Sequence, residues 1–307
     1  MLFRSGTGAV KITPAHDPND FEIGQRHCLE NITVIGFDGK ITNTLDEYNG
    51  LSVKEARKKI IDQLQKDGLL VKTEKINHAV GHCYKCGTVI EPLLKEQWFV
   101  KMKPLVNKAL SHIEDDEIKF FPESAKRNVL NYLKNLKDWN VSRQIAWGIP
   151  IPAFQNKEDP KDWIFNTRVT EPEIEIDGKT YICEEDIFDT WFSSSQWPYI
   201  TTDYLENGKN AKFYPNSVLE TGSDILYGWV SRMILMGVYR TGMVPFKEVY
   251  LHGMVLDEKG LKMSKSKGNV INPMEMLAKY GSDALRIGIS MITKRSEERR
   301  VGKECRS

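Results

Sequence analysis

The chain has 307 residues, of which 40% are hydrophobic and 28% charged, as expected of a globular protein with buried cores. Its 43 Lys and Arg residues against 42 Asp and Glu leave a net charge of +1, so the balance neither requires nor excludes a nucleic-acid partner. Five cysteines, an odd number, do not form a disulfide scaffold, and the first residues lack the apolar stretch of a signal peptide. The longest apolar-rich run, residues 234–239, is too short to cross a bilayer. Together these features favour a cytoplasmic protein without a membrane segment.

The first ninety residues carry the signals of a small α+β unit. Asp38-Gly39 predicts a hairpin between two strands over residues 32–42. Ser52 and Glu55 predict a capping box at the start of a helix. Apolar residues then recur at helical spacing until Gly68, where the helix should end.

The remaining sequence predicts helices first and then an alternation of strands and helices. One helix should follow Pro104 and another Ser124, and from about residue 139 to 292 the pattern alternates. Alternation of this kind favours a parallel α/β sheet. The predicted elements here are strands at 217–220 and 249–252, a turn at 221–224, a helix at 225–239, a turn at 257–260, and a helix opened by Asn272-Pro273.

The most specific motif is the loop GLKMSKSKGN, residues 260–269. It carries three lysines between two glycines, which allow such a loop to move over a bound nucleotide. When a carboxylate attacks the α-phosphate of ATP, the departing pyrophosphate gains negative charge, and ammonium groups placed against it stabilise the transition state. A contact of this sort contributes about 3–4 kcal/mol. A solvated lysine-rich turn is the alternative, but the strict order Lys-Met-Ser-Lys-Ser favours nucleotide chemistry.

This pentapeptide resembles the second signature of the class I aminoacyl-tRNA synthetases, and the surrounding chain resembles their valyl family. The similarity runs from Gly6 to about Met291. Isoleucyl relatives would normally have Asp-Ser-Gly where this chain has Ser193-Ser194-Ser195, so they are the second choice. The segments that carry the resemblance are TGAVKITPAHDPNDFEIGQRH, EQWFVKMKPL, DWNVSRQIAWGIPIPAF, DTWFSSSQWP, residues 218–236, HGMVLDEKGLKMSKSKGNVINP and GSDALR.

The resemblance implies an α/β fold containing the second half of a Rossmann-like nucleotide-binding domain, over residues 91–292 with its connecting helices. Residues 6–90 would be the C-terminal part of an α+β editing domain. The implied substrates and partners are ATP with Mg²⁺, L-valine and tRNA(Val), and the parent protein would be monomeric. Lys262 and Lys265 would be catalytic, and Trp191 would form a wall of the valine pocket. The ATP site would comprise Lys262, Met263, Ser264, Lys265, Ser266, His252, Gly253, Gly222 and Asp224.

An editing site and a metal half-site are further expectations. Asp20 matches the family's aspartate that holds the α-ammonium group of a misattached amino acid, and His16 and Asp17 are weaker candidates. Asp17 and Asp20 would otherwise serve a turn around Pro18. Cys83 and Cys86 have the spacing of half a zinc knuckle, so zinc stays uncertain and no complete metal site is predicted.

The same sequence predicts that this chain is a fragment, inactive alone. The first class I signature, His-x-Gly-His, does not occur in it. Residues 1–5 and the densely charged residues 294–307 look like non-native tails. A free-standing editing hydrolase and a paralogous tRNA-binding module are the alternative classes, but neither needs Lys262, Lys265 and Trp191 together.

Overall fold

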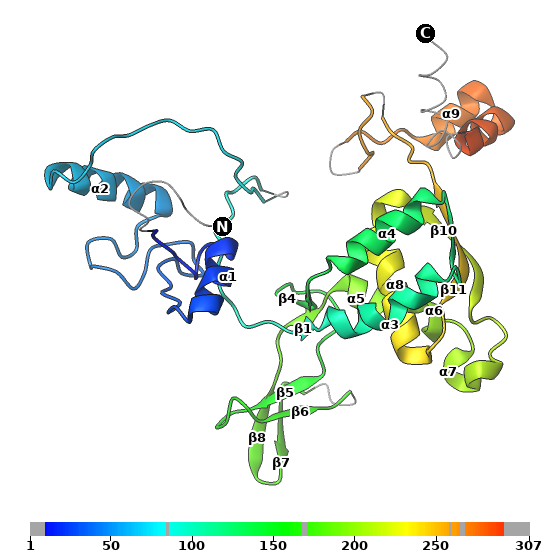
Figure 1. The fold of residues 1–307 in the computed structure, drawn as a ribbon, viewed down its shortest axis with the longest axis horizontal. Helices are drawn as coiled ribbons and strands as arrows, with labels where there is room; N and C mark the ends of the chain where they lie inside the picture. The colour runs from blue at the N-terminus through cyan, green and yellow to red at the C-terminus, as the bar shows by residue number, and fades with distance from the viewer. Residues whose placement is uncertain (1–9, 84–85, 168–170, 258, 265–267, 292–307) are drawn as a thin grey trace. The chain divides into compact units, whose positions relative to one another are not determined.

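The structure is a computed structural model that describes residues 10–83, 86–167, 171–257, 259–264 and 268–291 (Figure 1). The chain divides between Glu96 and Gln97 into two compact units. Each unit is described below by itself. No helix among the described residues is both long and apolar enough to cross a membrane.

The first unit contains two helices, α1 (Pro18–His27) and α2 (Val53–Lys66). The capping box predicted for α2 is confirmed, because Ser52 and Glu55 exchange hydrogen bonds, and Gly68 follows with a φ of 69°. The predicted hairpin turn is present at Gly39, whose φ is 74°. Its two strands are reduced to a single antiparallel bridge between Ile35 and Ile41.

The second unit is built around a parallel sheet with the strand order β10-β11-β2. Its strands are β2 (Lys119–Phe121), β10 (Asn216–Gly222) and β11 (Phe246–His252). The prediction of a parallel α/β sheet is therefore confirmed, although β2 had no sequence signal of its own. Both β10 and β11 extend beyond their predicted bounds.

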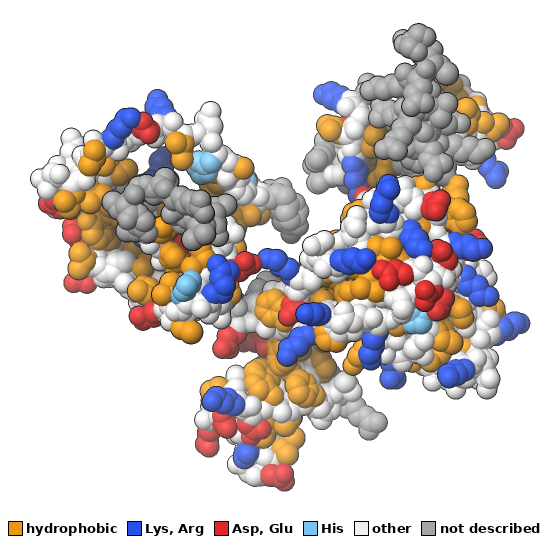
Figure 2. Space-filling model, viewed as in Figure 1, with side chains coloured by type: hydrophobic (Ala, Val, Ile, Leu, Met, Phe, Trp, Pro, Cys, Tyr) orange, Lys and Arg blue, Asp and Glu red, His pale blue; other side chains and the backbone are white. Residues whose placement is uncertain are grey.

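Helices α3 (Met102–Glu114), α4 (Ser124–Lys134) and α8 (Ser231–Thr241) pack beside this sheet (Figure 1). Their apolar positions enter one core, which explains the helical periodicity of the sequence. Their outward positions carry many of the Lys and Arg side chains visible over α3 and α4 in Figure 2. The side chains most deeply buried in this core are Met102, Ile113, Ile118, Val129, Leu133, Val230, Met233, Ile234, Leu235, Phe246 and Val249.

The segment predicted as one helix over residues 225–239 is instead made of three helical types. A 3₁₀ turn (Ser223–Ile225) leads into a π turn (Leu226–Val230) and then into α8. The Leu226 carbonyl accepts the Ser231 backbone N–H, five residues later, and also the Ser231 hydroxyl at 3.1 Å. These two bonds favour the wider turn over a regular α-helix at this point.

The expectation of strand–helix alternation from residue 139 is wrong up to residue 188. The described part of this stretch contains no helix, and four of its strands form an antiparallel sheet with the order β6-β5-β8-β7. Asp177 and Gly178, with φ of 51° and 75°, make the tight turn between β7 and β8. The four strands are β5 (Ala153–Asn156), β6 (Trp163–Phe165), β7 (Glu173–Ile176) and β8 (Lys179–Cys183).

Short elements connect these parts. Two antiparallel pairs join β1 (Phe99–Val100) to β3 (Trp139–Asn140) and β4 (Ser142–Arg143) to β9 (Ile187–Phe188). Asn272 caps the predicted helix α9 (Pro273–Tyr280), and a further helix covers residues 282–291. The other short helices are α5 (Thr190–Ser194), α6 (Trp197–Ile200), α7 (Tyr204–Asn207) and a 3₁₀ turn (Gly208–Asn210).

Candidate functional site at the carboxyl edge of the parallel sheet

Two predicted site residues end neighbouring strands of the parallel sheet. Gly222 is the last residue of β10, His252 is the last residue of β11, and the two are paired in the strand register. Open α/β sheets bind ligands beyond the carboxyl ends of their strands. The sheet therefore places these residues, far apart in sequence, where a ligand site is expected.

A side chain at position 222 would displace the side chains that now lie against Gly222. A Cβ atom at this position would lie 2.6 Å from Oδ1 of Asp224, 3.2 Å from the Met254 sulfur and 3.5 Å from Cε1 of His252. Its φ of −72° is open to any residue, so close approach and not backbone strain selects glycine. The Asp224 carboxylate can thus lie directly against the strand end.

The lysine-bearing loop reaches this edge through Lys262. The Lys262 ammonium group forms an ion pair with Oδ2 of Asp224. The Lys262 side chain is 62% exposed and that of Asp224 is 30% exposed, so both groups are open to an incoming ligand. Three of the predicted ATP-site residues, Gly222, Asp224 and Lys262, are thereby brought together.

His252, at the end of β11, lies near two polar groups at this edge of the sheet. Its Nδ1 lies 2.8 Å from the Gly253 carbonyl oxygen, and its Nε2 lies 3.8 Å from Oε1 of Glu220. The Gly253 contact fixes the tautomer, because a carbonyl oxygen can only accept and Nδ1 must carry the hydrogen. Cε1 of the ring lies 3.5 Å from the position that a Cβ of residue 222 would take, so the ring lies beside Gly222.

The ends of the signature loop are tied together by Asn269. Its Oδ1 accepts the Ser264 N–H at 2.9 Å, and its Nδ2 donates to the Lys262 carbonyl at 3.2 Å and to Oδ2 of Asp257 at 2.8 Å. Asp257 also caps the predicted turn, which the bridge between Leu256 and Lys262 confirms. The Met263 sulfur accepts the Ile271 N–H at 3.4 Å. The predicted residues Lys265 and Ser266 lie outside the described residues.

The predicted pocket residue, Trp191, lies on α5 and faces the π turn. A Cβ at Gly228 would lie 3.8 Å from two atoms of the indole, so the ring packs on the only position of that turn without a side chain. At the other end of α5, the Ser194 carbonyl accepts the Trp229 indole N–H at 3.1 Å. Trp191 thus belongs to the helix layer that follows β10.

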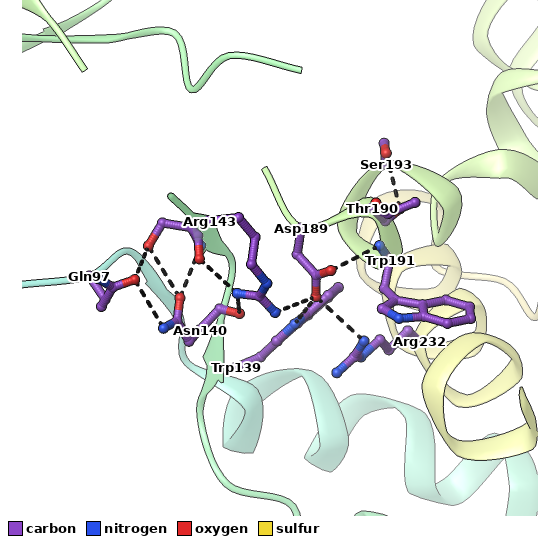
Figure 3. A network of polar contacts seen from close by, with 10 residues as sticks. Gln97, Trp139, Asn140, Arg143, Asp189, Thr190, Trp191, Ser193 and Arg232 are labelled. Carbon is purple, nitrogen blue, oxygen red and sulfur yellow. Dashed lines mark hydrogen bonds and ion pairs between the residues drawn. The ribbon is translucent and has the colours of Figure 1, made fainter. Parts of the chain in front are cut away.

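Sequence reasoning did not single out the polar network at the base of α5, which Figure 3 shows. The buried Asp189 carboxylate contacts Trp139, Arg143 and Arg232. Burial lowers the pKa of the Arg232 guanidinium, while nearby Tyr132 and Asp189 oppose that change. These residues lie in or beside segments that carry the family resemblance, but nothing local in the sequence shows that they meet.

In the first unit, the three candidate editing residues make backbone contacts. Asp17 caps α1 by accepting the N–H groups of Asn19 and Asp20. Both ring nitrogens of His16 are engaged, Nε2 by the Val34 N–H at 2.9 Å and Nδ1 by the Pro92 carbonyl at 3.1 Å. Oδ2 of Asp20 accepts the Thr13 N–H at 2.8 Å and the Thr13 hydroxyl at 3.2 Å. The carboxylate of Asp20 therefore differs from that of Asp17, because it does not cap a helix.

The predicted half-site, Cys83 and Cys86, lies in the first unit. The hydroxyl and backbone of Thr88, with Cys83, lower the pKa of the exposed Cys86 thiol to about 7. Nδ1 of His82 lies 2.8 Å from the Gly87 carbonyl. Within the described residues, no three His, Cys, Asp or Glu side chains are grouped to hold a metal ion. Two thiols are half of the four ligands that structural zinc needs.

A parallel sheet with an acidic turn and a lysine-bearing hairpin at its carboxyl edge is the arrangement of open α/β domains that bind ligands at this edge. A family profile described as tRNA synthetases class I (I, L, M and V) matches residues 33–301. The chain belongs to this family.

Two curated relatives agree with that assignment. Valine--tRNA ligase of Petrotoga mobilis is 47% identical over 290 residues, which are 94% of this chain and 33% of that protein. Valine--tRNA ligase of Carboxydothermus hydrogenoformans is 48% identical over 283 residues, 92% and 32% of the two chains. Among solved structures, the match to Mycobacterium tuberculosis methionyl-tRNA synthetase in complex with methionyl-adenylate covers 68% of this chain and 36% of that chain, with a TM-score of 0.44 and 19% identity. The chain thus spans about a third of the length of the curated relatives it matches, and the valyl resemblance is confirmed.

Proposed function

We propose that the protein containing this chain joins L-valine to tRNA(Val) with ATP, through a valyl-adenylate, and hydrolyses mischarged threonyl-tRNA(Val) at a second site. The similarity to valine--tRNA ligases supports the substrates. The single structural observation that carries the proposal is the Lys262 ammonium group at the Asp224 carboxylate, beyond the carboxyl end of β10. That position is where an α/β sheet binds a nucleotide.

In the proposed reaction, the valine carboxylate attacks the α-phosphate of ATP and pyrophosphate leaves. Lys262 and Lys265 stabilise the charge that develops on the leaving phosphates, and Mg²⁺ accompanies ATP. Before ATP binds, Asp224 holds Lys262 near the site, and the more highly charged triphosphate then competes for the ammonium group. Because the pair is exposed, this exchange requires little desolvation.

The remaining nucleotide contacts follow from the same edge. Gly222 leaves space beside the strand end, and His252 and Gly253 flank the adenine. Met263, Ser264 and Ser266 complete the closing loop. The Asn269 bonds to Ser264 and Lys262 support this assignment, because they fix the loop base from which the ammonium groups extend.

For the amino acid, Trp191 forms a flat wall that excludes side chains larger than valine. Its packing on Gly228 supports this role. An apolar pocket discriminates against the isosteric threonine by only about 100-fold, so a hydrolytic site is required as well. We assign the ammonium-binding carboxylate of that site to Asp20, with His16 and Asp17 shaping its backbone surroundings.

The test is a chimera in which this chain replaces the matching third of the Petrotoga mobilis ligase. The chimera should catalyse ATP–pyrophosphate exchange with valine in preference to isoleucine, and it should deacylate threonyl-tRNA(Val). The isolated chain, which lacks a His-x-Gly-His motif, should give no exchange. A folded chimera that prefers another amino acid would overturn the proposal, and an isolated chain that is active with valine would overturn only the expectation that the fragment is inactive alone.

A further inference from the structure

A single buried carboxylate, Asp189, joins the segments around the base of α5 (Figure 3). Its Oδ2 accepts the Trp139 indole N–H at 3.0 Å and lies 3.0 Å from Nη2 of Arg143 and 3.8 Å from Nη1 of Arg232. Its Oδ1 accepts the Trp191 backbone N–H at 3.3 Å. One oxygen therefore binds the protein framework and the other binds the start of the helix that carries Trp191.

The charge balance makes this carboxylate hard to replace. The Asp189 side chain is only 7% exposed, so an unpaired charge there would be strongly unfavourable. Two guanidinium groups and an indole N–H compensate for its desolvation. Without the carboxylate, those two cations would face each other with no anion between them.

Several contacts hold the framework side of the cluster in place. Arg232 comes from α8, and its guanidinium carbon lies 3.9 Å from the centre of the Trp139 ring. Arg143 donates from Nη1 to the carbonyls of Asn140 and Ser142, at 3.1 and 2.7 Å. The backbone N–H of Asp189 donates to the Val141 carbonyl at 2.7 Å. These contacts attach Asp189 to the strands and to α8, in addition to its hydrogen bond with α5.

The helix that Asp189 holds is too short to fix itself. Helix α5 has five residues and fewer than two full turns, so its orientation depends on its ends. Asp189 caps the first end, and the Trp229 indole binds the Ser194 carbonyl at the last. These two contacts and Gly228 hold the Trp191 ring together with the packing of α5 against the core.

We propose that Asp189 is a positioning residue that determines amino-acid specificity by fixing the Trp191 ring in the valine pocket. The inference rests on the proposed function, in which Trp191 is a wall of that pocket. Asp189 does not touch the substrate, and it acts only through α5. Its influence should therefore fall on recognition of the amino acid and not on ATP.

The substitution Asp189→Asn tests this role with little change in volume. Asparagine can cap a helix, but it has one acceptor oxygen in place of two. If that oxygen caps α5, the amide NH₂ faces the Trp139 N–H and the Arg143 guanidinium, donor against donors. If the oxygen faces these donors instead, the Trp191 N–H loses its acceptor. Either arrangement moves Trp191.

In the Petrotoga mobilis chimera, Asp189→Asn should raise the KM for valine about tenfold and leave the KM for ATP within twofold. The ratio of kcat/KM for isoleucine to that for valine should rise about tenfold. Ser193→Ala is the matched control, because its hydroxyl is on the same helix and, among the described residues, donates to the Thr190 carbonyl at 3.1 Å without contacting Asp189. The control should leave both constants unchanged. A role limited to stability would lower active enzyme without altering either KM or the ratio.

Trp191→Ala in the same chimera distinguishes a failure of the proposed valine pocket from a failure of the positioning role of Asp189. If Trp191→Ala leaves the valine KM unchanged, the proposed pocket is wrong. If Trp191→Ala raises that KM but a folded Asp189→Asn variant leaves the isoleucine-to-valine ratio unchanged, the positioning role alone is refuted. Should Asp189→Asn fail to fold, Arg143→Gln carries the test, because its side chain is 40% exposed. It should raise the valine KM about threefold with ATP unaffected, and an unchanged valine KM would reject the role.

Discussion

Replacement of Lys262 by alanine should slow valine activation by about 10²–10³ without unfolding the protein. Two magnitudes lead to this expectation. The Lys262–Asp224 pair is exposed, and pairs of this kind contribute about 0–1 kcal/mol to stability. An ammonium group aligned with a leaving phosphate contributes about 3–4 kcal/mol to the transition state. The reaction rate should therefore fall far more than the thermal stability.

The measurement is ATP–pyrophosphate exchange with the Petrotoga mobilis chimera at saturating valine, alongside its thermal unfolding. Lys259→Ala is the control, because Lys259 lies on the same hairpin and none of its described side-chain contacts reaches Asp224. Deacylation of threonyl-tRNA should stay normal in both variants, since the residues proposed for it belong to the other unit. A loss of less than threefold for Lys262→Ala, or an equal loss for Lys259→Ala, would refute the assigned role.

Two further predictions concern the first unit. Ser52→Ala should destabilise the start of α2 by about 1 kcal/mol, seen as faster hydrogen exchange of its first amides, because the capping box is lost; unchanged exchange would contradict this. Iodoacetamide should label Cys86 at a rate that rises with pH through about 7 and then levels off, as its thiolate forms. Cys183, whose pKa is raised by burial, should react only at higher pH, as peptide mass spectrometry would show; equal rates at pH 7 would contradict the Thr88 effect.

Features that depend on neighbouring residues were predictable. The capping box of Ser52 and Glu55, the Asn272 cap and the turn at Asp257 each form from residues within a few positions, so their signals are complete in the sequence. The tight turn at Asp177-Gly178 had the same kind of signal, and the prediction of alternating helices there overlooked it.

Features that depend on distant partners were not predictable. Strand β2 has three residues, and only its pairing with β11 makes it a strand. The π turn depends on a carbonyl that accepts two bonds from Ser231, a choice that periodicity does not show. Asp189 looks in sequence like an ordinary helix cap, and only the fold brings Trp139, Arg143 and Arg232 to its second oxygen.

The sequence by itself determined the family, the lysine-bearing loop and the residue types suited to phosphate chemistry, because motif order and local caps are written in adjacent positions. The tertiary structure alone decided that Lys262 meets Asp224 beside Gly222, and that one buried carboxylate joins Arg143, Arg232 and Trp139 to the helix that carries Trp191. The reason is physical: parallel strands bring their carboxyl ends to one edge whatever their separation in sequence, and a buried charge is stable only where the fold gathers its partners.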